Sequence, residues 1–353
     1  MAGRINMKRY GNLWDTITDF DNLLYAHKQA KKGKSWYREV QMVDSDPEYY
    51  IRWIQEELKN KTFATSEYEV MDRWDGRKMR VIHKLPYFPD RIVQHAMVQV
   101  CEPFWKASFI RDTFQSILSR GTHDARKRVE KKVRGTPGLY ALKFDIHKYY
   151  PSMDNEILKK KMRQKIKCKD TLWLIDDIID SNQGAPIGNY TSQYLGNIYL
   201  NDFDWWVKQQ LKPYGYFRYC DDIVLLIESS HEAHEHRKQI FDKLEKDFKL
   251  SIKPDWQVFP VDDRGLDFVG FVFDSDKTLL RKTIAKGIKN KKNSIIRSPE
   301  QMTDYQIANG MGSYWGWCKN IQAKTYWYKN VTKRAWQTVE NSKEVIKEFQ
   351  KCA

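Results

Sequence analysis

The sequence predicts an α+β protein in which short β-hairpins alternate with amphipathic helices. The clearest hairpin lies in GYFRYCDDIVLLIES, at residues 215–229, where the β-rich runs Tyr216–Cys220 and Ile223–Ile227 are joined by two aspartates. Aromatic and β-branched runs that meet at a two-residue polar step are typical of a hairpin, and Asp belongs at its tip. Apolar residues recur with helical spacing over residues 12–30, 92–106 and 194–211, and the C-terminal part is predicted to be helical as well.

The composition predicts a globular protein that binds a polyanion. A chain of 353 residues can form two or three subdomains. Its net charge is +15, and a basic globular protein most often binds a polyphosphate. An anionic membrane is the competing partner, but the sequence has neither an apolar run long enough to span a bilayer nor a secretory signal. Five scattered cysteines without CxxC spacing are typical of reduced thiols, so we expect a cytoplasmic protein.

The N-terminal part is predicted to contain helices on both sides of a strand-rich stretch. Residues 46–60 have helical character, residues 62–71 lean towards β structure, and residues 73–91 hold short strand-like runs separated by a glycine turn and two prolines. Cations alternate there with aromatic residues: Arg77, Lys78, Arg80, Lys84 and Arg91 with Trp74, Tyr87 and Phe88. This pattern suits a surface that binds phosphates and stacks on bases, although an ordinary solvated edge has the same pattern.

The middle of the chain places an acid at the end of a strand. Residues 139–147 (LYALKFDIH) are predicted to form a strand that is mostly apolar and is closed by Asp145. A carboxylate there is costly unless it is hydrogen-bonded or binds a metal. Two helices are expected at residues 157–167 and 172–179, and the Gly/Pro/Asn-rich turn at residues 183–193 opens the next helix. Such a turn can hold a phosphate or let a template backbone approach closely.

Beyond the hairpin the chain becomes strongly basic. Residues 238–248 continue a helix whose His-rich start, SHEAHEH, has the pattern of a solvated face rather than of a metal site. Residues 255–273 are predicted as strand, turn and strand, with Asp262–Gly265 as the turn and FVGFVF as the second strand. The basic segment 277–297 suits a nucleic-acid backbone. The aromatic residues that follow are predicted to form the core of a helical subdomain: Tyr314, Trp315, Trp317, Tyr326, Trp327 and Tyr328.

Two acidic features favour polymerase chemistry. Asp145 and the pair Asp221–Asp222 lie 76 residues apart with helices between them. Carboxylates arranged in this way hold two hard divalent cations for in-line nucleotidyl transfer, in which one ion activates a primer 3′-hydroxyl and the other neutralises the leaving pyrophosphate. The aspartate pair alone is as compatible with a solvated turn. The basic charge of the chain tips the balance towards a polymerase.

Three motifs, in order and suitably spaced, resemble those of reverse transcriptases. KFDIHKYYPSMD resembles their first catalytic motif, RYCDDIVLL resembles YxDD, and GLDFVGFVF is similar to the primer-grip hairpin. The resemblance covers nearly the whole chain and implies a right-hand polymerase fold. It implies that residues 1–280 form fingers (mainly 1–135) and palm (mainly 136–280), and that residues 281–353 form a short helical thumb. It also implies an RNA-directed DNA polymerase that binds template RNA, the RNA/cDNA duplex and dNTPs.

The second motif resembles that of diversity-generating retroelements. Residues 187–193 read IGNYTSQ where most cellular reverse transcriptases have QGxxxSP. Residues 12–30 and DRIVQHAMVQVCEPFW, at residues 90–105, are similar to the same group. Its members are bacterial or phage-encoded, copy a template RNA with errors concentrated at adenines, and act with a small basic accessory protein that forms a pentamer. Phage-defence and group II intron-like reverse transcriptases are the nearest alternatives, and a catalytically silent RNA-binding scaffold is the alternative from another class.

The resemblance also implies roles for individual residues. It makes Asp145, Asp221 and Asp222 the catalytic ligands of two Mg2+ ions, which Mn2+ can replace, with the backbone of Ile146 beside them. The nucleotide-binding residues it implies are Arg80 and Lys78 at the triphosphate, Tyr150 as the gate that excludes a 2′-hydroxyl, and Ile187, Gly188 and Gln193 in the second motif. The template and primer contacts it implies are Arg91, Lys282, Lys286, Lys289, Phe268 and Gly270. Lys253 is its candidate for the lysine of the fourth motif.

Overall fold

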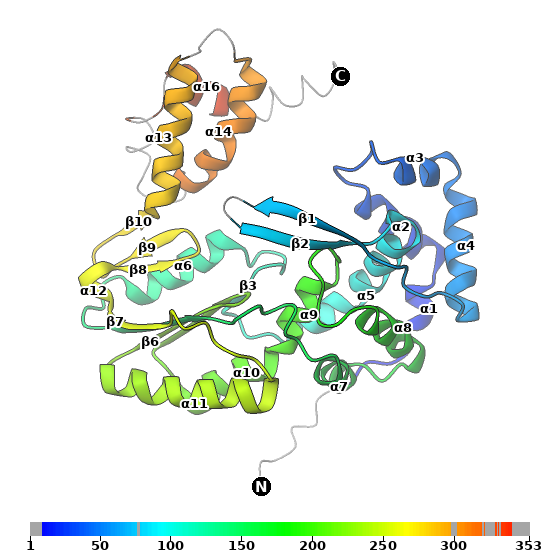
Figure 1. Ribbon diagram of the computed structural model, residues 1–353, viewed down its shortest axis with the longest axis horizontal. Helices are drawn as coiled ribbons and strands as arrows, with labels where there is room; N and C mark the ends of the chain where they lie inside the picture. Colours follow the sequence, from blue (N-terminus) through cyan, green and yellow to red (C-terminus); the bar gives the residue numbers. More distant parts are fainter. Residues whose placement is uncertain are drawn as a thin grey trace. The chain divides into compact units, whose positions relative to one another are not determined.

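The central element of the fold is a five-stranded sheet with the strand order β3-β5-β6-β4-β7. Its strands are β3 (Thr113–Phe114), β4 (Tyr140–Asp145), β5 (Gly215–Tyr219), β6 (Asp222–Ile227) and β7 (Gln257–Pro260). β6 is buried at every position after its first, which explains its continuous run of branched apolar residues. Phe241 of α11 (Ser230–Phe248) packs on Phe144 of β4, with ring centroids 5.7 Å apart, so α11 lies against one face of the sheet (Figure 1).

The computed structural model describes residues 9–75, 78–297, 302–319, 321, 329, 331 and 333–340. The chain divides into two compact units. Unit 1 comprises Met1–Leu118, Phe144–Ile223 and Glu235–Trp256, and unit 2 comprises Ser119–Lys143, Val224–His234 and Gln257–Ala353. This division follows packing within the chain, and the fingers, palm and thumb boundaries stay predictions. Among the described residues, no helix has both the length and the apolar character needed to cross a bilayer.

Unit 1 is mainly helical. Its helices are α1 (Trp14–Ile17), α2 (Phe20–Ala30), α3 (Arg38–Ser45), α4 (Pro47–Asn60), η1 (Tyr87–Arg91), α5 (Ile92–Ser108), α7 (Asn155–Lys165), α8 (Lys169–Asp180), α9 (Ser192–Tyr199), α10 (Asn201–Trp206) and η2 (Val207–Leu211). The carboxylates of Asp19 and Asp46 accept backbone N–H groups at the starts of α2 and α4, which fixes where these helices begin. The helices predicted from residues 46–60 and 92–106 are confirmed, whereas the stretch predicted over residues 12–30 is divided into α1 and α2, because Asp19 caps a new helix there.

A long hairpin in unit 1 joins β1 (Glu69–Asp75) to β2 (Lys78–Lys84). The prediction of β structure from residue 62 was wrong, because residues 62–68 are irregular. Polar side chains satisfy the backbone there instead: Asp177 accepts from Thr65 N at 3.0 Å, and Asp90 accepts from Ser66 N at 3.0 Å. These bonds keep the segment in place without a partner strand.

Unit 2 contains a second small sheet and a helical subdomain. The sheet has the order β10-β9-β8, from β8 (Leu266–Phe268), β9 (Phe271–Phe273) and β10 (Thr278–Leu280). The prediction that FVGFVF forms one strand was wrong. Val269 and Gly270 have φ values of 45° and 87°, which fold the run into two antiparallel strands. The predicted turn at Asp262–Gly265 contains the short helix α12 (Val261–Arg264).

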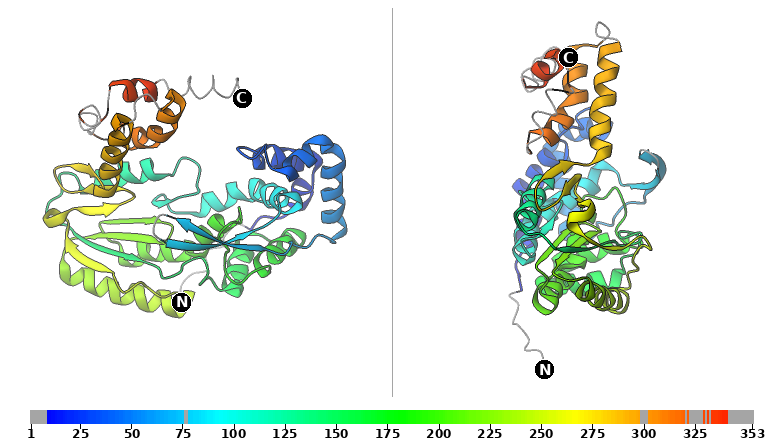
Figure 2. Two further views of the ribbon diagram at one scale, coloured as in Figure 1. Left: turned by 45° about the horizontal axis from the view of Figure 1, so that its top comes forward. Right: turned by 90° about the vertical axis from the view of Figure 1, so that its left-hand side faces the viewer.

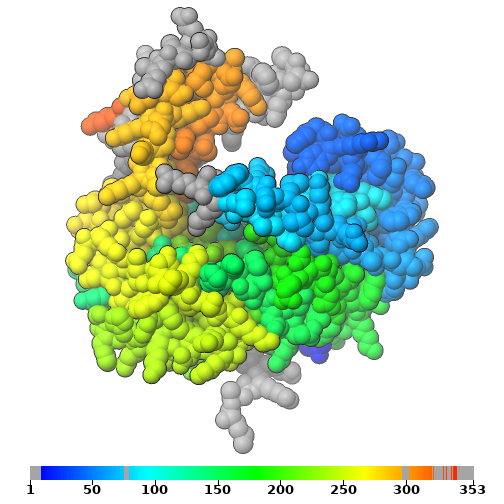
Figure 3. All heavy atoms as spheres, in the orientation of Figure 1, coloured from blue at the N-terminus to red at the C-terminus, as the bar shows by residue number. Residues whose placement is uncertain are grey.

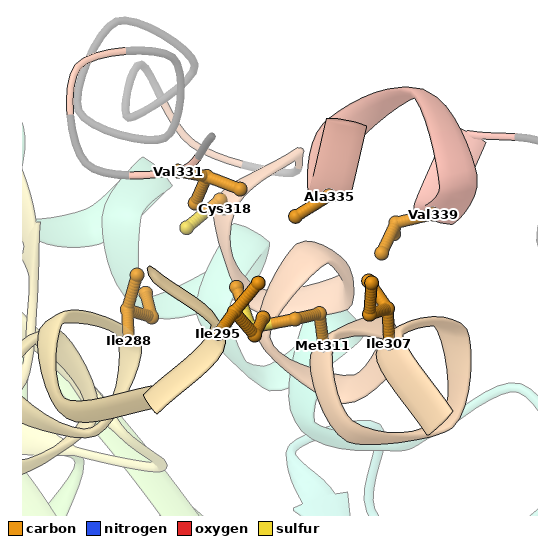
Figure 4. Packing of buried hydrophobic residues seen from close by; sticks show 8 residues of the cluster. All are labelled: Ile288, Ile295, Ile307, Met311, Cys318, Val331, Ala335 and Val339. Atoms are coloured by element: carbon orange, nitrogen blue, oxygen red, sulfur yellow. The ribbon is translucent and has the colours of Figure 1, made fainter. Parts of the chain in front are cut away.

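The other helices of unit 2 are α6 (Thr122–Val133), α13 (Lys282–Arg297), α14 (Asp304–Cys318) and α16 (Lys333–Glu340). α13 and α14 lie side by side (Figure 2). Ile288 and Ile295 of α13 meet Ile307 and Met311 of α14 in an apolar core (Figure 4). The predicted aromatic core is only partly visible, because Tyr326, Trp327 and Tyr328 lie outside the described residues, whereas Tyr314 and Trp315 border this core.

Candidate active site

The structure brings Asp145 and Asp221 together at the ends of two neighbouring strands. β4 ends at Asp145, and the next residue, Ile146, donates its N–H to the Asp221 carbonyl at 3.2 Å. On its other side, Ile146 forms a bridge to Ile252. Ile146 is fully buried, backbone included. The two acidic motifs, distant in sequence, therefore form one site.

Lys253 supplies positive charge at this site. Its N–H donates to the Asp145 carbonyl at 2.9 Å, and its Nζ lies 3.7 Å from the Asp145 carboxylate. Lys253 is the candidate lysine of the fourth motif. Its backbone hydrogen bond to Asp145 places it beside the motif that resembles the first one of reverse transcriptases.

Asp221 is a partly desolvated carboxylate that follows a residue in the left-handed backbone region. Cys220, just before it, has a φ of 59°, and the turn consists of Cys220 and Asp221, whereas Asp222 is the first residue of β6. The hairpin is therefore confirmed, but the prediction that both aspartates lie in the turn was wrong. Burial, and then repulsion from Asp145, raises the pKa of Asp221.

This donor set fits a divalent cation. The two repelling carboxylates of Asp145 and Asp221 offer hard oxygen ligands, which Mg2+ prefers. No group of three or more His, Cys, Asp or Glu side chains in the described part of the chain is arranged to hold a metal ion. The ligand set of three aspartates therefore stays a prediction, and the structure itself supports the Asp145–Asp221 pair.

Behind the catalytic turn lies a buried ion pair that the sequence analysis missed. Arg218 in β5 and Asp204 in α10 are both 0% exposed, and they form two bonds of 2.8 and 2.7 Å. Arg218 also donates to the Cys220 carbonyl at 3.2 Å and to the Asn197 side chain at 3.3 Å. The guanidinium thus supports the turn that carries Asp221. An Arg within an otherwise apolar strand was the available signal.

Tyr150, the predicted nucleotide gate, is held through both its side chain and its backbone. The Cys220 thiol donates to its hydroxyl at 3.0 Å, and its carbonyl accepts from Ala185 N at 2.9 Å. Burial raises the pKa of both groups, that of Cys220 to about 12, so both are neutral. Gly184 has a φ of 71°, and a Cβ there would lie 2.6 Å from the Tyr150 carbonyl, so this approach requires glycine. Tyr150 thus links the YxDD turn to the second motif.

The second motif lies against the β1–β2 hairpin. The Ile187 carbonyl accepts from His83 N at 2.9 Å. Gly188 has a φ of 132°, and a Cβ there would lie 2.1 Å from the His83 carbonyl. Gln193 is exposed at the start of α9, where its side-chain carbonyl accepts from the Ser116 hydroxyl. The backbone of Ile187 and Gly188 thus attaches the second motif to β2, a role that was not predicted for either residue.

The β1–β2 hairpin presents cations on one face. Arg80 is exposed, and the strand register places Arg73 directly opposite it. The hairpin lies on the face of the molecule that Figure 3 shows. Opposed residues of an antiparallel pair point to the same face, so the two guanidinium groups are neighbours. Lys78 begins β2, and its side chain lies outside the described residues.

The expected template and primer contacts differ in accessibility. Lys282, Lys286 and Lys289 are exposed along one face of α13, at a spacing of four and three residues, as a backbone-binding surface requires. Arg91 is half-buried. Phe268 is fully buried and Gly270 is buried too, with Trp317 ring atoms 2.6 Å from where a Cβ of Gly270 would be. Both residues pack inside unit 2 in this structure, and their contacts with template or primer stay predictions.

The chain is similar in sequence to a bacterial protein and in fold to a solved polymerase structure. The chain is 25% identical over 232 residues to the protein YkfC of Escherichia coli (strain K12), an alignment that covers 53% of this chain and 61% of YkfC. The chain thus spans less than two thirds of that relative. The solved structure of apo telomerase from Candida tropicalis matches 84% of this chain and 63% of its own, with a TM-score of 0.51 and 11% identity, which shows a shared polymerase fold.

The family model for reverse transcriptase (RNA-dependent DNA polymerase) matches residues 73–273, a range that runs from the β1–β2 hairpin through both aspartate motifs to the end of β9. The match therefore contains every element of the site around Asp145 and Asp221. The chain belongs to the reverse transcriptase family.

Proposed function

We propose that this protein is an RNA-directed DNA polymerase that copies a template RNA into cDNA. The observation that carries the proposal is the pairing of Asp145, at the end of β4, with Asp221, in the turn before β6, beside Lys253. Two repelling carboxylates with an adjacent ammonium form a site for cations and phosphates rather than for an apolar ligand.

Asp145, Asp221 and Asp222, with the carbonyl of Ile146, would hold two Mg2+ ions, or Mn2+ in their place. Bound there, the ions supply a lowered pKa at the primer 3′-hydroxyl and positive charge for the leaving pyrophosphate. Lys253 adds positive charge beside Asp145. Arg80 and Arg73, on one face of the hairpin, suit the triphosphate of the incoming dNTP, with Lys78 at the start of the same strand.

Tyr150 would select deoxyribonucleotides by occupying the space that a 2′-hydroxyl needs. The Cys220 thiol and the backbone of Ala185 hold the Tyr150 side chain and main chain, so the ring is fixed relative to Asp221. A fixed ring discriminates better than a mobile one, because an extra oxygen cannot displace it cheaply.

The finer proposal is mutagenic copying of the kind found in diversity-generating retroelements. Ile187 occupies the position at which accurate relatives have Gln, so a polar contact to the nascent pair is replaced by an apolar one. Loss of that contact loosens the discrimination between base pairs, and errors opposite adenine are the expected result. A small basic pentameric accessory protein is the expected partner, in a bacterial or phage-encoded cytoplasmic system.

The test is cDNA synthesis on an RNA template with Mg2+ and all four dNTPs, with and without the accessory protein, followed by sequencing. The control is the double variant Asp221→Asn/Asp222→Asn, which should make no product. Products rich in substitutions opposite adenine would support the mutagenic proposal, and Ile187→Gln should lower those errors. Faithful products would favour a phage-defence or intron-like enzyme. No product with the cognate RNA and the accessory protein would contradict polymerase function.

A further inference from the structure

The β1–β2 hairpin has a second face that the proposed reaction does not use. Arg73 and Arg80, which suit the triphosphate, lie on one face. The residues next to them along each strand point the opposite way, because side chains alternate along a strand. We call this opposite side the apolar face, and the strand register assigns to it Val70, Asp72, Trp74, Met79, Val81 and His83.

The apolar face is anchored at one end and exposed along the rest. At its base His83 is half-buried, and the Asn182 side chain donates to its ring nitrogen at 2.9 Å. Beyond His83 the large apolar residues are open to solvent: Trp74 is 70% exposed, Val70 59%, Met79 57% and Val81 47%. The hairpin projects from the body of unit 1 (Figure 2). A contiguous exposed apolar patch of this kind marks an interaction surface rather than a solvated edge.

One edge of the hairpin is open. Its sheet consists, among the described residues, of β1 and β2 alone. β2 is attached to the second motif, because His83 N donates to the Ile187 carbonyl, whereas β1 has no other strand beside it in the part of the chain that the structure describes. An edge strand offers its outward N–H and C=O groups to a strand of another chain, and an apolar row beside the edge adds side-chain contacts. The surface therefore suits an extended segment of a partner protein.

The charge of β1 favours a basic partner. The strand reads EVMDRWD, with three acids and one base, in a chain whose net charge is +15. Glu69 is paired with Lys84 of β2 at 3.0 Å. Asp72 lies between Val70 and Trp74 on the apolar face. A carboxylate at that place repels the phosphates of a nucleic acid and attracts a Lys or Arg side chain, so the face matches a protein segment that is both apolar and basic.

A second copy of this chain fits the edge poorly. A two-fold dimer through β1 would pair the strand with its own copy in antiparallel register. Centred on Asp72, that pairing sets Asp72 against Asp72 and Glu69 against Asp75. Like charges directly opposite each other destabilise a pair of strands. The edge therefore disfavours self-association, and a basic protein of another kind is the matching partner.

We propose that β1 and the apolar face form a docking surface for a basic partner protein, an extended segment of which adds to β1 as a third strand. Apolar side chains of that segment cover Val70 and Trp74, and a Lys or Arg between them faces Asp72. The surface itself does not depend on catalysis. That its partner is the small basic accessory protein rests on the proposed function.

The probe is a fluorescein-labelled peptide, KTVTKTVTK, which presents Val and Lys on one face of an added strand and Thr on the face that Arg73 occupies. Its binding to the full chain is measured by fluorescence anisotropy at about 50 mM salt, without template or dNTP. Asp72→Lys should weaken binding about tenfold, because it turns an attraction across the strands into a repulsion. Trp74→Thr should weaken it about fivefold, because it removes an aromatic cross-strand contact.

Two matched variants and one modified peptide serve as controls. Asp242→Lys makes the same charge change at an exposed position of α11, and Met71→Thr changes the opposite face of β1. Neither should alter the affinity for the peptide. The same peptide with N-methyl groups on alternate residues cannot donate strand hydrogen bonds and should bind at least about tenfold more weakly.

Four outcomes would overturn the proposal. Asp72→Lys could bind the peptide as tightly as Asp242→Lys does, or the N-methylated peptide could bind as tightly as its parent. A labelled single-stranded RNA that loses affinity for Trp74→Thr, while peptide binding is unchanged, would assign the face to nucleic acid. A wild-type dimer in light scattering that Trp74→Thr dissociates would assign it to a second copy of the chain.

Primer extension separates this proposal from that of the enzyme. Wild type that makes no cDNA, while the peptide binds with the expected pattern, contradicts the polymerase and leaves the docking surface in place. Wild type that makes cDNA, while Asp72→Lys and Trp74→Thr bind the peptide normally, contradicts the docking surface alone.

Discussion

Replacing Arg218 by Met should destabilise the protein strongly because it leaves a buried, unneutralised carboxylate. Arg218 and Asp204 are both 0% exposed. Removing one partner of a buried ion pair typically costs about 3–5 kcal/mol. Asp204 would keep two donors, the Tyr216 hydroxyl at 2.6 Å and the Thr113 hydroxyl at 2.9 Å. These bonds place the expected loss at the lower end, about 3 kcal/mol.

The measurement is the free energy of unfolding from urea titration followed by intrinsic fluorescence. The double variant Asp204→Asn/Arg218→Met should regain most of the loss, because it removes the charge that the single variant leaves unpaired. The matched control is Lys243→Met. Its ion pair with Asp247 has the same 2.7 Å separation, but the two side chains are 25% and 54% exposed. It should cost less than about 1 kcal/mol.

Activity distinguishes support of the catalytic turn from simple stability. Arg218 donates to the Cys220 carbonyl, where φ is 59°, and the double variant lacks that bond. Its kcat should therefore stay low although its stability recovers. An Arg218→Met variant as stable as the Lys243→Met control would refute the energetic reasoning. A double variant with wild-type kcat would refute the role at the turn.

Three further predictions concern the site itself. Gly188→Ala should lower activity at least tenfold, because its Cβ would overlap the His83 carbonyl; Gly312→Ala, which has open space in α14, is the control and should keep full activity in primer extension. Tyr150→Val should raise the ratio of ribonucleotide to deoxyribonucleotide incorporation in single-nucleotide assays, and an unchanged ratio would argue against its role as the gate. Asp221→Asn should raise the Tm of the protein in EDTA at neutral pH. Because the pKa of Asp221 is raised in the folded state, Asp221 stabilises the fold only while it is protonated, and this contribution is lost as pH rises through that pKa. Asn is neutral at every pH and avoids this loss. The difference in Tm between variant and wild type should shrink towards pH 4. Mg2+ should raise the Tm of wild type more than that of the variant, and an equal rise in both would contradict metal binding at Asp221.

The sequence predicted the positions of Asp145 and Asp221 because their signals are local. Asp145 ends an apolar strand and Asp221 lies in a hairpin turn, and each pattern can be recognised without knowing the partner. Their pairing followed from the known order of motifs. The turn between β5 and β6 was also recognised. It was expected at Asp221 and Asp222 but consists of Cys220 and Asp221, because Cys220 adopts a left-handed conformation.

Other features depend on which distant element packs against a residue. The pairing of Arg218 was not identified because its acid comes from α10, and an Arg within an apolar strand does not reveal which distant residue neutralises it. FVGFVF was assigned to one strand because alternation alone does not reveal that Val269 and Gly270 reverse the chain. Phe268 was expected at the surface for the same reason, since burial is decided by the whole of unit 2.

The second motif shows why a fidelity experiment at Ile187 can be interpreted. Its carbonyl bonds to His83 N, and this backbone contact does not depend on the side chain. Ile187→Gln therefore changes the surface offered to the nascent pair while the loop keeps its attachment to β2. Gly188→Ala does the reverse, because it adds no functional group but collides with the His83 backbone. A changed error spectrum in the first variant with normal kcat, and a lower kcat in the second, would assign fidelity to the side chain at residue 187. If Ile187→Gln instead lowers kcat as Gly188→Ala does, the loop position sets both properties, and the loss of a polar contact cannot explain errors at adenine.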